Sequence, residues 1–352
     1  MSSQLAEPDR EWCHEAVEGV SRTFALTVEV LEEPMATQIC LGYLLCRIAD
    51  TIEDSGEIPP AEQEALLETY DEVLDPDAET TMVEFRDAVE PWMPPPEARS
   101  EDWTVVARAP TVWATFEAEC DGVKPAVVPP VREMITGMAA FVRRHADTGG
   151  LRITDPAELE EYCHYAAGTV GTLVTNLLSR GSIEDDCRRR MESTAEEFGL
   201  LLQIINVAKD VHDDYTEENN VYLPAEWLAE ESVDPDTVLD PENRDAAARV
   251  VRRTADHAAG YLDDAQAYLE AMPLTQGNTF AAWAVPFLLG VGTLRELRER
   301  PADALTERGV KVPREEVLAV MTAVDDASRD SLSEFRATIT EQPFHTADTT
   351  PQ

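Results

Sequence analysis

The chain has 352 residues, of which 70 are Asp or Glu and 28 are Lys or Arg, so its formal net charge is −42. A charge of this size repels itself at low salt and is tolerated at molar salt, which predicts a cytosolic protein of a salt-loving cell. Nucleic acid is not an expected partner, because binding phosphates needs a basic patch and nothing in the sequence resembles one. Apolar residues make up 43% of the chain, enough for a folded core.

Helical periodicity dominates the sequence, and strand alternation with hairpin signals is hard to find. The segments that fit helices are 11–31, 34–54, 61–74, 111–120, 131–147, 157–181, 188–214, 242–272 and 280–299. No repeat and no linker between independent cores is evident. We therefore predict one all-α domain over residues 1–336, followed by a polar, disordered tail over residues 337–352.

The cysteines, the start of the chain and its longest uncharged stretch indicate where in the cell the protein is expected. The six cysteines form no CxxC pair, which predicts reduced, buried thiols instead of a zinc site. The polar start of the chain predicts no signal peptide. Residues 274–294 form a long uncharged stretch, but its Gln, Asn, Thr, Gly and Pro residues indicate a buried helix more than a membrane span. We expect a cytoplasmic protein without a membrane anchor.

The stretch DVHDD places three aspartates, Asp210, Asp213 and Asp214, after the apolar segment 198–208. On a helix these spacings share one face, where like charges repel one another. Negative charge also opposes the dipole at a helix C-terminus, so the position is poor for stability alone. The alternative is an ordinary acidic helix end, because a frame of three acids arises by chance in so acidic a chain.

The stretch DTIED repeats this frame, with Asp50, Glu53 and Asp54 after the apolar segment 36–49. Oxygen ligands of this kind suit Mg²⁺, which keeps several waters and bridges to substrate phosphates. Two such clusters, each at the end of an apolar helix, predict a cavity for a substrate with a diphosphate head and an apolar tail.

Cations near these clusters are few. Arg22, Arg47 and Lys209 are candidates for holding diphosphate oxygens, Arg through its planar fork and Lys as a point charge. The alternative for each of them is an ion pair with a neighbouring acid.

Six blocks in order along the chain resemble the squalene and phytoene synthases, which are head-to-head prenyl transferases. They are SRTFALTVEVL, GYLLCRIADTIED, ITGMAAFVRRH, EYCHYAAGTVG, LLQIINVAKDVHDD with VYLP, and NTFAAWAVPFLLGVGTL. The resemblance implies the single-domain, all-α isoprenoid synthase fold with a central apolar cavity. The forms SRTFA and DTIED are more similar to squalene synthase than to phytoene synthase.

The resemblance also implies roles for individual residues. The metal ligands would be Asp50, Glu53, Asp54, Asp210, Asp213 and Asp214, and the diphosphate oxygens would contact Arg22 and Arg47. Phe24 would line the pocket near the reacting carbons, and Tyr43 and Tyr165 would lie near the developing cation, with Tyr165 assisting proton loss. Gln203 and Asn206 would face the same cavity. The alternative for Phe24 is plain core packing.

The implied reaction is Mg²⁺-dependent condensation of two farnesyl diphosphates to presqualene diphosphate, followed by NADPH-dependent reduction to squalene. Apolar walls would keep water from the cations. One alternative is a phytoene or dehydrosqualene synthase without the reduction, and another is a non-catalytic relative that acts as a binding protein. Lys209 stands where the family usually has Arg, and Asn219 with Asn220 where an Arg usually precedes VYLP. Phe287 replaces a polar residue of animal squalene synthases. The sequence indicates no oligomeric state, and it leaves open a peripheral membrane contact for product release.

Overall fold

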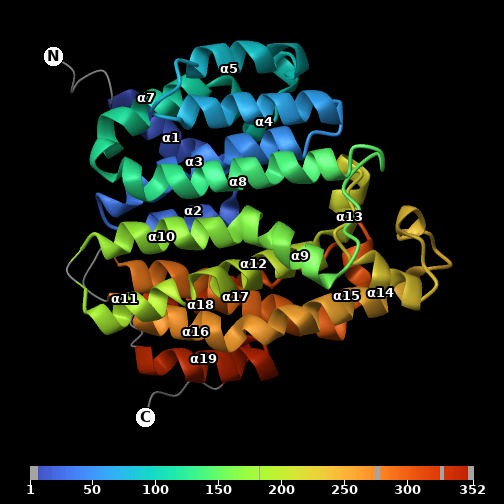
Figure 1. Ribbon diagram of the computed structural model, residues 1–352. Helices are drawn as coiled ribbons and strands as arrows, with labels where there is room; N and C mark the ends of the chain where they lie inside the picture. Colours follow the sequence, from blue (N-terminus) through green and yellow to red (C-terminus); the bar gives the residue numbers. More distant parts are fainter. Residues whose placement is uncertain (1–6, 182, 274–277, 326–328, 348–352) are drawn as a thin grey trace. The chain divides into compact units, whose positions relative to one another are not determined.

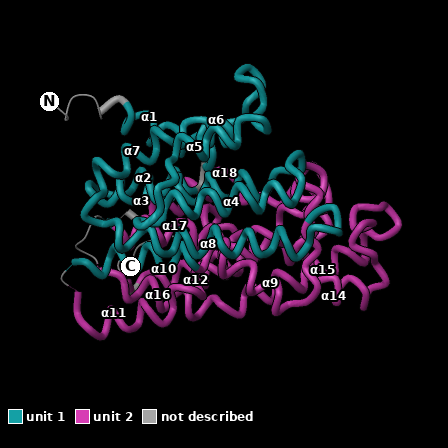
Figure 2. The backbone as a smooth tube through the Cα atoms, turned by 45° about the horizontal axis from the view of Figure 1, so that its top comes forward, with its two compact units in different colours: residues 1–150, 169–182, 275–278 teal, residues 151–168, 183–274, 279–352 magenta. Residues whose placement is uncertain are grey.

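A computed structural model describes residues 7–181, 183–273, 278–325 and 329–347. The regular elements of these residues are helices, and the bridging found among them is a single isolated pair, Arg152 with Val221 (Figure 1). The predicted all-α fold is confirmed. Residue contacts divide the chain into two compact units (Figure 2), a finer division than the single domain predicted.

Unit 1 comprises residues 1–150, 169–182 and 275–278. Its α-helices are α1 (Glu7–Val20), α2 (Arg22–Val30), α3 (Met35–Glu53), α4 (Pro60–Leu74), α5 (Met82–Val89), α6 (Glu101–Ala107), α7 (Ala109–Cys120), α8 (Lys124–Arg144) and α10 (Thr169–Ser179). Short 3₁₀ turns lie at Glu90–Trp92, Pro96–Ala98 and Asp121–Val123.

Helix α3 forms the centre of unit 1, where it packs against α4, α6, α7 and α8. Its side chains Leu41, Leu44, Leu45 and Ile48 are fully buried. Each such side chain contributes about 1.5–3 kcal/mol by leaving water, which explains why this apolar segment takes the central place. The hydroxyl of Tyr70 on α4 donates to the Leu45 carbonyl at 2.9 Å.

Unit 2 comprises residues 151–168, 183–274 and 279–352. Its helices are α9 (Pro156–Cys163), α11 (Asp185–Glu192), α12 (Ala195–Lys209), α13 (Val211–Asp213), α14 (Ala225–Glu230), α15 (Arg244–Ala258), α16 (Leu262–Ala271), α17 (Thr279–Glu299), α18 (Arg314–Asp325) and α19 (Arg329–Glu341). Two π-helical segments, His164–Gly168 and Asp214–Glu218, follow α9 and α13. The 3₁₀ turns are Pro235–Thr237, Ala259–Tyr261, Pro301–Leu305 and Phe344–Thr346.

Helices α12, α15, α16 and α17 pack together as the core of unit 2. The ring of Phe198 on α12 lies 5.2 Å from that of Tyr268 on α16 and 6.2 Å from that of Trp283 on α17. Helix α17 is long and apolar enough to cross a membrane, but 89% of its most apolar window is buried inside the protein. The interpretation of the stretch 274–294 as a buried helix is therefore confirmed from Thr279 onward, and residues 274–277 lie outside the described part of the chain.

Some predicted boundaries were wrong. The segment predicted as one helix over 11–31 breaks at Ser21, whose extended backbone and side-chain hydroxyl cap α2. The prediction of a disordered tail from residue 337 was wrong for residues 337–347. Helix α19 continues to Glu341, and Ile339 and Phe344 are buried, so packing orders the chain through Ala347. Residues 348–352 lie outside the described part of the chain.

Each cysteine is a free thiol, and all are buried except Cys187, which is half-buried. The prediction of reduced, buried thiols is confirmed for the other five. Burial raises the pKa of the Cys13 thiol to about 11 and that of Cys120 to about 12. These thiols pack as small apolar side chains, since the reactive thiolate form is disfavoured.

Candidate active site

One face of α3 stays partly exposed in an otherwise buried helix. Tyr43, Arg47, Asp50 and Asp54 are half-buried, whereas the residues between them are buried. Their spacings of four, three and four residues place them in one row along the helix. This row, called the α3 row, begins with the aromatic ring of Tyr43, continues with the cation Arg47 and ends with the predicted metal ligands Asp50 and Asp54. An aromatic, a cationic and an anionic group therefore share one face of α3.

The aromatic end of this row is a stacked pair from two helices. The ring of Phe24, in the first turn of α2, lies 4.0 Å from the ring of Tyr43 with an interplanar angle of 18°. Ser21 fixes this turn, because its hydroxyl accepts the N–H of Phe24 at 3.3 Å. Burial raises the pKa of Tyr43 to about 12, so its hydroxyl is neutral at physiological pH. Neutral aromatic faces suit a carbocation, since the ring quadrupole attracts positive charge.

Arg47 lies between two carboxylates. Its Nε donates to Oδ1 of Asp102 at 2.7 Å, and its Nη1 lies 3.7 Å from Oδ2 of Asp50. Burial disfavours the charged guanidinium, but the nearby Asp50, Tyr43 and Asp102 outweigh this and raise the pKa of Arg47. Asp102, in the first turn of α6, was missed by the sequence reasoning. No spacing relates it to DTIED, and no local signal separates it from other acids of the chain.

The carboxylates Asp50 and Asp54 of the first acid cluster are costly to ionise, chiefly because of burial. Burial raises the pKa of Asp50 to about 7, Arg47 opposes this shift, and Asp54 and Asp102 add to it. Burial also raises the pKa of Asp54, and the Glu53 side chain is 5% exposed. A group of carboxylates that is costly to ionise is a donor set that a divalent cation stabilises.

A buried glutamine holds the end of α3. The amide nitrogen of Gln63 on α4 donates to the carbonyls of Glu53 at 2.8 Å, Ile52 at 3.0 Å and Ser55 at 3.1 Å. The last carbonyls of a helix have no partner within the helix. Gln63 therefore supplies the missing donor at the turn that carries the first acid cluster.

The second acid cluster does not lie on one continuous helix. Helix α12 ends at Lys209, Asp210 caps it, Asp213 ends the short α13, and Asp214 begins a π-helical segment. The Asp214 N–H still donates to the Asp210 carbonyl at 2.9 Å, so the spacing of one turn is kept. Lys209 forms an ion pair with Asp210, which is the alternative predicted for this lysine.

Gln203 and Asn206 lie on the less buried face of α12, about two turns and one turn before Asp210, respectively. Gln203 is half-buried and Asn206 is exposed. Both residues lie on the helix face that leads to the second acid cluster, and their orientation toward a substrate cavity stays a prediction.

Tyr165 lies in the π-helical segment that follows α9. This segment contacts α12 closely at Gly199, where an added Cβ would lie 2.5 Å from the Ala167 carbonyl oxygen, so only glycine fits. Beside it, His164 Nδ1 lies 3.0 Å from Oε1 of Glu196 on α12. Single π turns inside helices recur at functional sites. The tyrosine is half-buried.

The sequence model of the squalene/phytoene synthase family matches residues 17–316. The chain belongs to this family. Members of the family are prenyltransferase enzymes, which act on prenyl diphosphates. The match covers both units, including the α3 row and the segment that carries the second acid cluster.

The chain is 26% identical to squalene synthase of Bos taurus over 283 residues, which cover 80% of this chain and 62% of that enzyme. It therefore spans less than two thirds of that relative's length. Among solved structures, a TcSQS complex with the ligand BPH1237 covers 98% of this chain at 21% identity, with a TM-score of 0.80. A dehydrosqualene synthase complex covers 92% of this chain at 20% identity, with a TM-score of 0.62. These structures share the fold.

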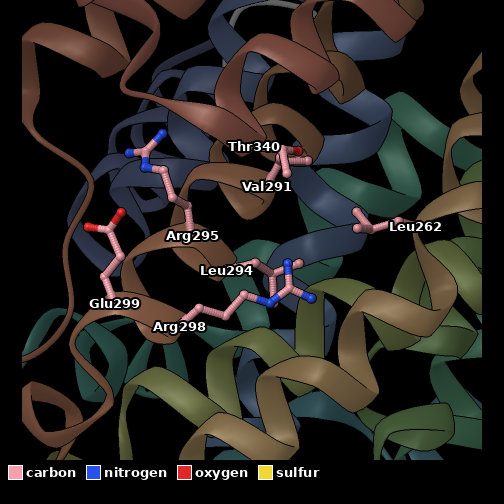
Figure 3. Close-up of a pocket in the computed structure, with 7 residues that line it drawn as sticks. All are labelled: Leu262, Val291, Leu294, Arg295, Arg298, Glu299 and Thr340. Carbon is pink, nitrogen blue, oxygen red and sulfur yellow. The ribbon is translucent and has the colours of Figure 1, made fainter.

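Two surface cavities contain none of the predicted site residues. In unit 1 a groove of about 920 Å³ lies along α4, α7 and α8, where Arg132 pairs with Asp71 and Lys124 with Glu117. In unit 2 a pocket of about 170 Å³ is lined by Leu262, Val291, Leu294, Arg295, Arg298, Glu299 and Thr340 (Figure 3). The smaller pocket lies below the roughly 300–1,000 Å³ of typical ligand sites. The Arg and Lys side chains that line these two cavities already pair with acidic residues. The central apolar cavity implied by the resemblance stays a prediction.

Two further predictions concern the side chain of Arg22 and the binding of a metal ion. Arg22 begins α2, and its side chain lies outside the part of the chain that the structure describes. Within the described residues, no three His, Cys, Asp or Glu side chains are arranged to hold a metal ion by themselves. Mg²⁺ commonly binds through one or two carboxylates, with waters and substrate phosphates as its other ligands, so the donor set still fits this ion.

Proposed function

We propose that this protein is a squalene synthase that joins two farnesyl diphosphates to presqualene diphosphate and reduces this intermediate to squalene with NADPH. The observation that carries the proposal is the α3 row, in which the stacked Phe24 and Tyr43 lead through Arg47 to Asp50. The row combines an aromatic surface for a cation with charged groups for a diphosphate. The similarity to squalene synthase over 80% of the chain supports the same reaction.

The charged groups prepare the departure of diphosphate. Asp50, Glu53 and Asp54, with Asp210, Asp213 and Asp214, would hold Mg²⁺. Bound Mg²⁺ would neutralise the leaving diphosphate and so lower the barrier to ionisation. Arg47 and Arg22 would contact diphosphate oxygens directly, and Lys209 would do so after exchanging its pair with Asp210.

The apolar and neutral groups serve the prenyl chains. The stacked rings of Phe24 and Tyr43 present an aromatic surface to an allylic cation and offer it no charged nucleophile. Tyr165 would accept the proton that is lost as the cyclopropane closes, with the released diphosphate as the final acceptor. Gln203 and Asn206 would orient the substrate along α12. The reductive step rests on the similarity to squalene synthase, and NADPH is the proposed hydride donor.

Product analysis tests this proposal. The purified protein in molar KCl with Mg²⁺ would receive farnesyl or geranylgeranyl diphosphate, with and without NADPH. We expect presqualene diphosphate from the C15 substrate alone and squalene when NADPH is added. Dehydrosqualene in both conditions would exclude the reductive step, and phytoene from the C20 substrate would exclude the assigned chain length. A peripheral membrane contact for product release and a cytoplasmic location stay predictions.

A further inference from the structure

The segment that follows the second acid cluster is held by little regular structure of its own. After α13 the chain forms the π-helical turn Asp214–Glu218, which ends at Asn219 in the left-handed conformation with φ of 58°. The Asp214 carbonyl accepts the N–H of Asn219 and that of Asn220, the latter at 2.9 Å. The position of the Asp214 backbone is therefore tied to the positions of the two asparagines.

Arg152 fixes Asn219 from another part of unit 2. Its Nη1 donates to the main-chain oxygen of Asn219, and its Nη2 donates to the Asn219 side-chain oxygen at 3.0 Å. Its Nε donates to Oδ1 of Asp236 at 3.0 Å. The Arg152 side chain is 11% exposed, whereas its partners Asn219 and Asp236 lie at the surface, so a mostly buried guanidinium holds two surface residues.

The backbone around Arg152 adds a second set of hydrogen bonds. The Val221 N–H donates to the Leu151 carbonyl at 2.9 Å, and the Ile153 N–H donates to the Val221 carbonyl at 3.2 Å. The Asn220 side-chain oxygen accepts the Leu151 N–H at 2.8 Å. Leu151 and Ile153, on either side of Arg152, therefore bind the segment 220–221, and the Arg152 side chain binds Asn219, the residue with the left-handed backbone.

We propose that Arg152 is a positioning residue that sets the Mg²⁺ affinity of the second acid cluster without contacting the metal. By fixing Asn219 it holds the turn that carries Asp213 and Asp214, so that less conformational freedom is lost when the metal diphosphate binds. Residues that orient metal ligands in this way typically change metal affinity by roughly 10–100-fold when they are replaced. The inference rests on the proposed metal-binding role of this cluster.

Three variants test this role: Arg152→Met, Arg152→Lys and, as a control, Arg249→Met. Arg249 also donates two hydrogen bonds, from Nε at 2.9 Å and Nη2 at 2.7 Å to Oε2 of Glu231 in the same unit, but it shares none of the Arg152 partners. Calorimetry with Mg²⁺ and inorganic diphosphate measures binding without turnover, and hydrogen exchange reports on residues 214–222. We expect roughly 10-fold weaker Mg²⁺ binding and faster exchange for Arg152→Met. Arg152→Lys should be intermediate, and the control unchanged.

Unaltered Mg²⁺ binding by Arg152→Met despite faster exchange would overturn the inference, as would equal weakening in the control. If Arg152→Met does not fold, Asp236→Leu takes its place, because Asp236 is exposed and its Oδ1 accepts the Arg152 Nε–H that helps to hold the guanidinium against Asn219. For this variant too we expect weaker Mg²⁺ binding and faster hydrogen exchange of residues 214–222. Faster exchange with Mg²⁺ affinity equal to that of the wild type would overturn the proposal. Failure of the proposed reaction is separate, since it would appear as missing prenyl products from a wild-type protein that still binds Mg²⁺ and diphosphate.

Discussion

Arg47 on α3 and Asp102 on α6 form the shortest of the ion pairs of the α3 row, with Nε and Oδ1 2.7 Å apart. A single hydrogen bond from Nε fixes the plane of the guanidinium while Nη1 stays 3.7 Å from Asp50. Both side chains are partly exposed, 27% for Arg47 and 29% for Asp102, so the pair contributes little to folding. Its main effect is on the direction in which the arginine fork points.

Replacing Asp102 by Asn should therefore impair substrate use more than stability. The variant keeps a hydrogen-bond acceptor but loses the charge that orients Arg47, and we expect kcat/KM for farnesyl diphosphate to fall about 5–10-fold, the equivalent of about 1–1.4 kcal/mol. Steady-state kinetics would measure the change. Asp71→Asn is the matched control, because Asp71 pairs with Arg132 at similar exposure and lies outside the α3 row. An equal loss in both variants would contradict this role of Asp102.

Gln63 should matter for stability through the end of α3. Gln63→Met keeps the volume but leaves the carbonyls of Ile52 and Glu53 without their buried donor, which should cost about 1–3 kcal/mol in the free energy of unfolding. Urea unfolding at high KCl would measure it. Thr69→Ala on the same helix removes one exposed hydrogen bond, at 2.8 Å to Ala65, and should change stability by less than about 0.5 kcal/mol. A Met variant as stable as the wild type would refute the capping role.

Lowering the pH should reduce the free energy of unfolding of unit 2, because Glu296 becomes protonated. The Glu296 side chain is 8% exposed. Burial opposes its ionisation, but Arg295 and Arg300 outweigh burial and lower its pKa below the ordinary 4.5. A lowered folded-state pKa adds stability that is present above 4.5 and is lost as the pH falls through the lowered value. The free energy of unfolding should therefore fall less on acidification in Glu296→Gln than in the wild type. Identical pH profiles would show that this carboxylate does not contribute.

The sequence was sufficient for features that depend on local periodicity. The apolar residues of α3 and α12 predicted two buried helices with acids at their ends, and both helices are present, although the single helix predicted over 188–214 is divided into α11, α12 and α13. The family resemblance implied that Phe24 lines the pocket near the reacting carbons and that Tyr43 lies near the developing cation, but it did not predict that the two rings stack.

Features that depend on tertiary contact could not be predicted. Asp102 is 55 residues from Arg47, and Arg152 is 67 residues from Asn219, and neither spacing follows from helix geometry. The π-helical segment around Tyr165 also escaped prediction, because its helical pattern continues without a break in composition. The tail was misjudged because a polar amphipathic helix becomes ordered once a few apolar side chains, such as Ile339, are buried.

The central claim is that the carboxylates of both clusters assist the departure of diphosphate. Its most direct test is the rate of diphosphate release from farnesyl diphosphate, with and without Mg²⁺, in the wild type, Asp50→Asn and Asp210→Asn, with thermal unfolding as the check on folding. We predict Mg²⁺-dependent release by the wild type and a loss of at least about 100-fold in each variant, since each removes a group that stabilises the transition state. Release at the wild-type rate by folded Asp50→Asn and Asp210→Asn would contradict the claim.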